Sequence, residues 1–135
     1  MTSYSRVCYI AAMRSSREDE PRPEDFLPLH RDTFQILVSL ADRERHGYSI
    51  LLDVAERTGG ALRFSPSSLY ASIKRLLHQE LIEELAERPD PDEDDERRRY
   101  YRLTRLGRKV AEVEARRLER LLADARATGL LGRRA

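Results

Sequence analysis

Hydroxyl-bearing and cationic side chains gather on one side of a predicted helix at residues 65–80, SPSSLYASIKRLLHQE. Successive helical residues are about 100° apart, so this side combines short hydroxyls, a methyl group, a phenol and cations. Its residues are Ser67, Ser68, Tyr70, Ala71, Lys74, Arg75 and His78. Small side chains permit close approach to a DNA groove, cations bind phosphates, and hydrogen-bonding groups reach base edges. Taken alone, the pattern fits the solvated face of an ordinary amphipathic helix somewhat better than a surface that contacts DNA.

On the DNA hypothesis, the side chains of this helix have distinct roles. Ser68, in the first turn, would donate to a phosphate beside the free N–H groups of the helix start. Lys74 would neutralise a phosphate or reach a guanine. Tyr70 would contact the DNA backbone through its hydroxyl, or would instead pack against the preceding helix.

A second cationic group, Arg97, Arg98 and Arg99, directly follows the acidic run PDPDEDDE at residues 89–96. These arginines would contact a minor groove or nearby phosphates, or they would pair with the acidic run. The acidic run would repel DNA, so we also predict that it restrains nonspecific binding.

The acidic run has one feature of a calcium loop, because Asp90, Asp92 and Asp94 occupy its first, third and fifth positions. The sixth position is Asp95, where the loop needs glycine, and the twelfth is Tyr101, where it needs glutamate. The sequence therefore predicts no metal site here.

The chain shows no catalytic pattern. His30, His46 and His78 lie in a predicted loop, turn and helix, without a serine or carboxylate at the spacing of a triad. His46 fits a turn or helix cap better than a sensor. No phosphate-binding glycine loop or HExxH motif is present, so we expect neither an enzyme nor a cofactor.

Length and composition indicate one domain. The 135 residues are 40% hydrophobic and 36% charged, and the net charge of +1 gives no support for a nucleic-acid partner by itself. No apolar run approaches the ~18 residues that span a bilayer. The single Cys8 suits a reducing cytoplasm. The true start could be Met1 or Met13.

The elements that would position the helix at 65–80 form a winged helix-turn-helix. Ser65 and Pro66 are strong start signals for that helix. Two helices precede it, from Leu29 to residues 42–45 and from Tyr48 to about Thr58, and residues 61–64 form an extended link that could be a single strand. Alternation at residues 81–88 and 99–103 predicts the hairpin of a wing. The fold class is mainly α (α+β), with a disordered extension at 1–25 and the DNA-binding domain at 26–104.

A last helix, at residues 105–129 after a Thr104 cap, precedes a short tail at 130–135. One side of it is apolar: Leu106, Val110, Val113, Leu118, Leu121 and Leu122. A helix this long exceeds what so small a domain can cover, so we predict a homodimer formed through this stripe. The alternative is a monomer in which the helix only covers its own domain.

Several motifs together resemble the PadR family of bacterial transcriptional regulators. They are HGYSI at 46–50, SPSSLY at 65–70, KRL at 74–76, LI at 81–82 and RYYRLT at 99–104. The resemblance covers residues 27–122 and implies a winged-helix repressor of the shorter subgroup, which dimerises through one C-terminal helix and binds an inverted-repeat operator.

This sequence departs from the family in two respects. Family members commonly have Gly-Thr where this chain has Ser67-Ser68. Ligand stacking on a tryptophan pair is not carried over, because the chain has no Trp; any small-molecule effector stays unknown.

The competing prediction is a winged-helix protein-interaction module that does not bind DNA.

Overall fold

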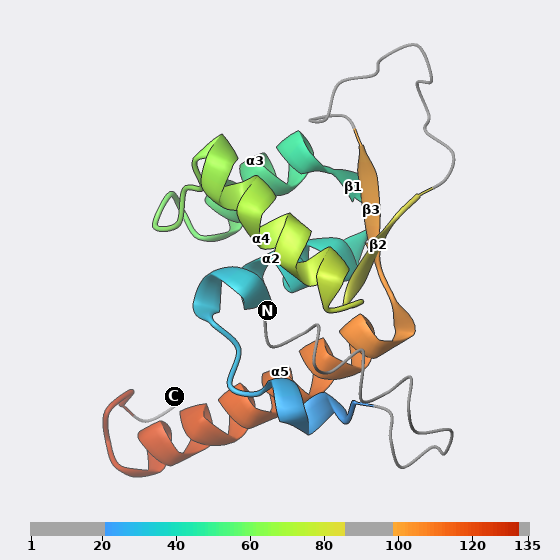
Figure 1. The fold of residues 1–135 in the computed structure, drawn as a ribbon. Helices are drawn as coiled ribbons and strands as arrows, with labels where there is room; N and C mark the ends of the chain where they lie inside the picture. Colours follow the sequence, from blue (N-terminus) through green and yellow to red (C-terminus); the bar gives the residue numbers. More distant parts are fainter. Residues whose placement is uncertain (1–20, 86–98, 133–135) are drawn as a thin grey trace.

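The computed structural model describes residues 21–85 and 99–132, in which helices dominate. A 3₁₀ turn, η2 (Pro23–Phe26), precedes the helices α2 (Arg31–Asp42), α3 (Gly47–Arg57) and α4 (Pro66–His78). The strands are β1 (Arg45–His46), β2 (Ile82–Glu84) and β3 (Tyr100–Leu103), and the last helix is α5 (Arg105–Ala127). Figure 1 shows α2, α3 and α4 grouped beside the sheet, with α5 running below them. The predicted winged helix-turn-helix with a long last helix is confirmed.

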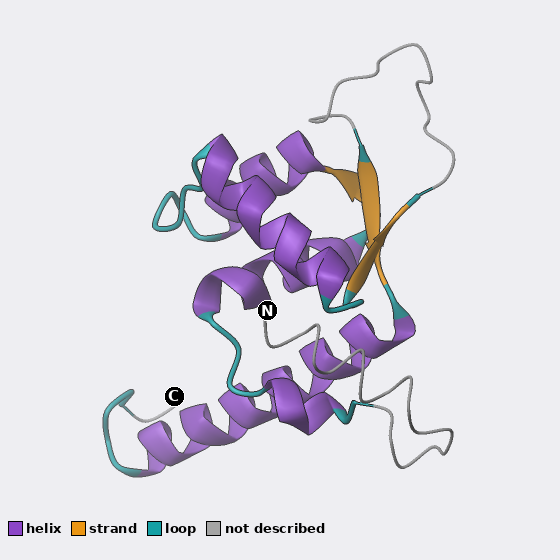
Figure 2. Ribbon diagram, viewed as in Figure 1, coloured by secondary structure: helices purple, strands orange, loops and turns teal. Residues whose placement is uncertain are grey.

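The sheet is antiparallel, in the order β1-β3-β2 (Figure 2). The predicted hairpin is present: Ile82 pairs with Leu103 and Glu84 with Tyr101. The prediction of a possible strand at residues 61–64 was wrong, because the third strand is β1, with His46 opposite Tyr100. A two-residue strand has no periodicity of its own, so no sequence pattern could reveal it.

The core lies between the three central helices and the sheet. Its fully buried side chains include those on the inner face of α4, as the helical period predicts. The core residues are Ile36, Leu37, Leu40, Ile50, Val54, Phe64, Leu69, Ile73, Leu76, Leu81, Ile82, Tyr101 and Val110. In β3, Tyr101 is buried while Arg102 is exposed, which agrees with the alternation in the sequence.

Side chains cap each of the four α-helices that the structure describes. Ser65 Oγ accepts from Ser68 N–H at 3.2 Å, and Thr104 Oγ1 accepts from Gly107 N–H at 3.0 Å, as predicted. The ring of His46 caps α3 by accepting from Ser49 N–H at 3.0 Å. The ring of His30 caps α2 in the same way, a role that the sequence did not reveal because histidine is a rare cap.

Helix α5 approaches the body closely at its start. A Cβ built on Gly107 would lie 1.8 Å from the carbonyl oxygen of Leu81, so only glycine fits there. Further along, Glu114 is 1% exposed and accepts from Leu29 N–H at 2.9 Å. Beyond this point α5 extends away from the three-helix body (Figure 1).

The N-terminal boundary of the ordered domain differs from the prediction. Residues 1–20 lie outside the described residues. The 3₁₀ turn η2 (Pro23–Phe26) packs against α5, and its first three residues lie within the 1–25 segment predicted to be disordered. Phe26 and Leu27 contribute apolar surface to the core, and this burial orders a segment whose polar, proline-containing sequence suggested disorder.

Candidate nucleic-acid interface

The outer face of α4 carries the residues that the sequence analysis selected. Leu69, Ile73 and Leu76 are buried on its inner face. The exposed residues on the outer side are Ser67, Ser68, Ala71, Lys74, Arg75 and His78. Six of the seven predicted contact residues on this helix therefore share one accessible surface, and Tyr70 is the exception.

This surface is locally cationic although the whole chain is nearly neutral. Residues 58–79 contain Arg63, Lys74 and Arg75, all exposed, and no Asp or Glu. Elsewhere the charges include both signs, and the acidic run at residues 89–96 is followed directly by three arginines. The lack of acidic residues over this stretch is a further signal in the sequence, which the net charge of the whole chain conceals.

The hydroxyls at the start of α4 already form hydrogen bonds within the helix cap. Ser68 Oγ donates to the carbonyl oxygen of Ser65 at 3.0 Å, and Ser65 Oγ lies 3.3 Å from Ser67 Oγ. To donate to a phosphate, as predicted, the Ser68 hydroxyl would have to leave that carbonyl. Ser67 is the less constrained of the two.

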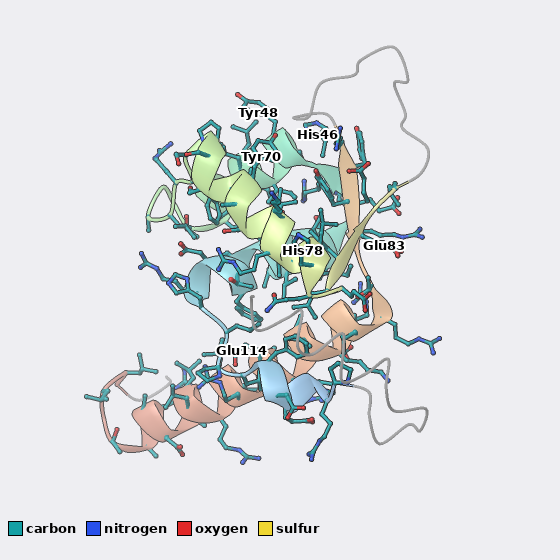
Figure 3. All side chains as sticks on the ribbon, viewed as in Figure 1. His46, Tyr48, Tyr70, His78, Glu83 and Glu114 are labelled. Carbon is teal, nitrogen blue, oxygen red and sulfur yellow. The ribbon has the colours of Figure 1, made fainter. Side chains whose placement is uncertain are left out.

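Tyr70 packs against the preceding helix, which was the second of its two predicted roles. A Cβ built on Gly47 would lie 2.8 Å from both Cε1 and Oη of Tyr70, so the ring packs directly on the start of α3. The Tyr70 hydroxyl oxygen is buried there. In this structure Tyr70 therefore does not offer its hydroxyl to a DNA backbone, because the ring packs between α4 and the start of α3 (Figure 3).

The described part of the wing carries paired charges. Arg99 lies 3.6 Å from Glu84, and Arg102 donates to Glu83 across the strands at 2.6 Å. The hydrogen bond to Glu83 raises the pKa of Arg102. Arg99 therefore pairs with a carboxylate of its own chain, as in the alternative to DNA contact, but its partner is Glu84 and not the acidic run. Arg97, Arg98 and the acidic run lie outside the described residues.

A charge cluster links α2, β1 and α3. Asp53 lies 2.6 Å from Arg57 and 3.2 Å from Arg45, and Asp42 lies 2.8 Å from Arg45. Burial raises the pKa of Asp53, but the neighbouring Ser39 hydroxyl and the two guanidinium groups outweigh it, so the pKa is lowered. The cluster therefore holds the C-terminal half of α3 beside the end of α2 and β1.

The predicted dimerisation stripe on α5 is divided between two environments. Val110 is fully buried in the core of its own chain, and Leu106 and Val113 are half-buried. Val110 therefore has no exposed surface for a partner in this structure. The outer three residues, Leu118, Leu121 and Leu122, are 36%, 56% and 47% exposed.

Other site types find no support in the described residues. Within residues 21–85 and 99–132, no helix combines the length and apolar character that crossing a membrane requires. Over the same ranges, no group of three or more His, Cys, Asp or Glu side chains is placed to bind a metal ion.

Comparisons with known proteins agree with this geometry. The model of the family described as "Transcriptional regulator PadR-like family" matches residues 36–113. Uncharacterized protein X of Lysinibacillus sphaericus is 34% identical over 84 residues, which cover 62% of this chain and 73% of that protein.

Two solved structures share the fold. A PadR family transcription regulator from Clostridium difficile R20291 superimposes with a TM-score of 0.60 and 22% identity, covering 71% of this chain and 95% of that one. A transcriptional regulator from Clostridium thermocellum superimposes with a TM-score of 0.58 and 22% identity, covering 70% and 86%.

Proposed function

This chain belongs to the PadR-like family of transcriptional regulators and is a DNA-binding regulator, and we propose that it is a dimeric repressor that reads an inverted-repeat operator with α4. Members of this family are transcription regulators rather than enzymes. The observation that carries the proposal is the outer face of α4, which is exposed, free of acidic residues and supplied with Lys74 and Arg75.

In the proposed complex, α4 lies in the major groove. Ser67 and Ala71 are short enough for the helix to approach the bases closely, while Lys74 and His78 extend along the groove. Arg75, beside this stripe, would bind a phosphate. The absence of acidic side chains from residues 58–79 also argues against the alternative of a protein-interaction surface that excludes DNA.

The wing would add contacts beside the groove. Arg97 and Arg98 would bind phosphates or enter the minor groove, and Arg99 would join them by exchanging Glu84 for a phosphate. Neutralising the acidic run should raise affinity for random DNA if that run restrains nonspecific binding.

A second subunit would supply the other reading helix. We infer that Leu118, Leu121 and Leu122 pair across a two-fold axis, because they form an exposed apolar stripe on the part of α5 that leaves the body. Two α4 helices about 34 Å apart would then meet half-sites one DNA turn apart. A regulator of this kind would act in the cytoplasm, where the chromosome is.

The chain offers a matched test, because its only two lysines are Lys74 on α4 and Lys109 on α5. Duplexes are first selected from a random pool by the parent protein. We expect Lys74→Ala to weaken binding to the selected duplex about tenfold and to lower the salt slope by about one, since one phosphate contact is lost. Lys109→Ala should bind like the parent. Equal behaviour of the two variants would contradict the placement of α4 on DNA.

A further inference from the structure

We propose that the His46-Gly47 junction positions the wing against α4, so that helix and wing meet DNA as one rigid unit. The inference rests on the proposed DNA-binding function. It assigns a positioning role to His46, Gly47 and Tyr70, none of which needs to touch DNA.

The strand order places such a junction at one edge of the sheet. Strand β2 follows α4 almost directly in the chain, so one edge of the sheet is tied to the end of α4. Buried Ile82 and Tyr101 hold the inner face of the sheet on the core, while this covalent link acts at the edge formed by β2. Strand β1 lies at the opposite edge, on the far side of β3, and leads directly into α3. A second attachment through β1 fixes the angle between the sheet and the helix.

Gly47 contacts both the wing and helix α4. Its N–H donates to the carbonyl oxygen of Arg99, at the start of the wing strand, at 3.2 Å. Its Cα faces the ring of Tyr70 on α4, where an added Cβ would lie 2.8 Å from two ring atoms. The φ of Gly47 is not in the left-handed region, so the backbone conformation does not require glycine here. Glycine is required because the ring of Tyr70 lies so close.

His46 adds a second link to the same strand. Its ring packs edge-on against the ring of Tyr100, with centroids 5.3 Å apart and planes at 83°. The same ring caps α3 by accepting from Ser49 N–H. One side chain therefore fixes the start of α3 and the position of β3 together (Figure 3).

The two histidine caps provide a matched pair of variants. Asn is a good helix cap, so His46→Asn keeps the acceptor for α3 but removes the ring from Tyr100. His30→Asn makes the same exchange at the start of α2, where the ring is exposed. Gly47→Ala is the second test variant, because its methyl group would displace Tyr70. Thermal unfolding identifies which variants fold.

On a duplex selected by the parent, folded His46→Asn should lose about tenfold in affinity and lower the salt slope by about one or two, because wing contacts to phosphates are lost. Hydroxyl-radical footprints should keep the protection under α4 and lose the flanking protection under the wing. Gly47→Ala should behave likewise, and His30→Asn like the parent. A purely structural defect would instead lower affinity with a full footprint and an unchanged salt slope, which would overturn the proposal.

Hydrogen exchange without DNA separates this inference from the proposed function. In His46→Asn, the amides of residues 100–103 should exchange at least several-fold faster, while the amides of α4 keep the parent rates. If the parent selects no duplex, the DNA-binding function fails and the exchange rates alone decide whether the junction holds the wing. Parent-like exchange at residues 100–103 in both His46→Asn and Gly47→Ala would end the proposal.

Discussion

The two halves of α5 have the same apolar period but different surroundings. In the first half, Val110 and Glu114 are buried against the body and the N-terminal segment. In the second half, Leu121 and Leu122 are about half exposed. The comparison teaches that one continuous stripe serves two purposes, the first half joining the core of its own chain and the second remaining available to a partner.

The boundary between the halves lies at a buried carboxylate. Glu114 accepts from Leu29 N–H and from Arg117 Nε, the latter at 2.5 Å. Burial of a charged group is costly unless such partners are present. Residues 115–124 are exposed, so Glu114 is the last residue of α5 buried on the body. Variants before, at and beyond this boundary test the comparison, and their expected effects on the stability of one subunit decrease in that order.

The largest effect is expected for Gly107→Ala, at the closest contact of the first half. The added methyl group would meet the carbonyl of Leu81, a backbone atom that cannot move aside alone. We expect a loss of about 3 kcal/mol or more in the free energy of unfolding. Thermal and urea unfolding followed by circular dichroism measure it. The exposed Ala115→Ser is the control, and equal midpoints for both variants would show that the first half is not tightly packed.

An intermediate effect is expected for Glu114→Gln, which keeps an acceptor for Leu29 N–H but loses the charge that pairs with Arg117. The cost should be about 1–2 kcal/mol at neutral pH. The exposed Glu119→Gln is the control and should change stability little.

The pH dependence of the Glu114 contribution follows from its pKa. The hydrogen bond from Arg117 lowers this pKa, with the Leu29 N–H helping and burial opposing, below its ordinary value of 4.5. A lowered folded-state pKa contributes stability that is complete above 4.5 and is lost as the pH falls through the folded-state value. The difference between parent and Glu114→Gln should therefore shrink on acidification. A difference that stays constant down to pH about 3 would contradict the ion pair between Glu114 and Arg117.

The smallest effect on the stability of one subunit is expected for Leu121→Asp in the second half. Its side chain is exposed, so the free energy of unfolding should change by less than about 0.5 kcal/mol. Association should be lost, because a carboxylate would be buried in the proposed interface. Sedimentation velocity measures the change. Ala123→Asp, about 200° around the helix, should still dimerise; dimerisation of both variants would place the interface elsewhere.

Much of the fold could be predicted because its signals are local. The caps at Ser65 and Thr104, the buried face of α4 and the alternation of Tyr101 with Arg102 each depend on neighbouring residues only. The exposed residues of α4 follow from the same period. The 3₁₀ turn η2 was missed, since it is ordered by contact with α5, more than 80 residues later in the sequence.

The sequence by itself determined the order of the helices, the hairpin, and the existence of one polar, cationic helix face, since periodicity and capping act within a few residues. Only the tertiary structure decided that Tyr70 packs on Gly47, that β1 completes the sheet, and that Val110 and Leu121 have different surroundings. A helical period indicates which side of a helix is apolar, but what packs against that side depends on elements far away in the chain. The body of the subunit covers only the first half of α5. An apolar residue such as Val110 is therefore buried there, whereas Leu121 beyond it stays exposed.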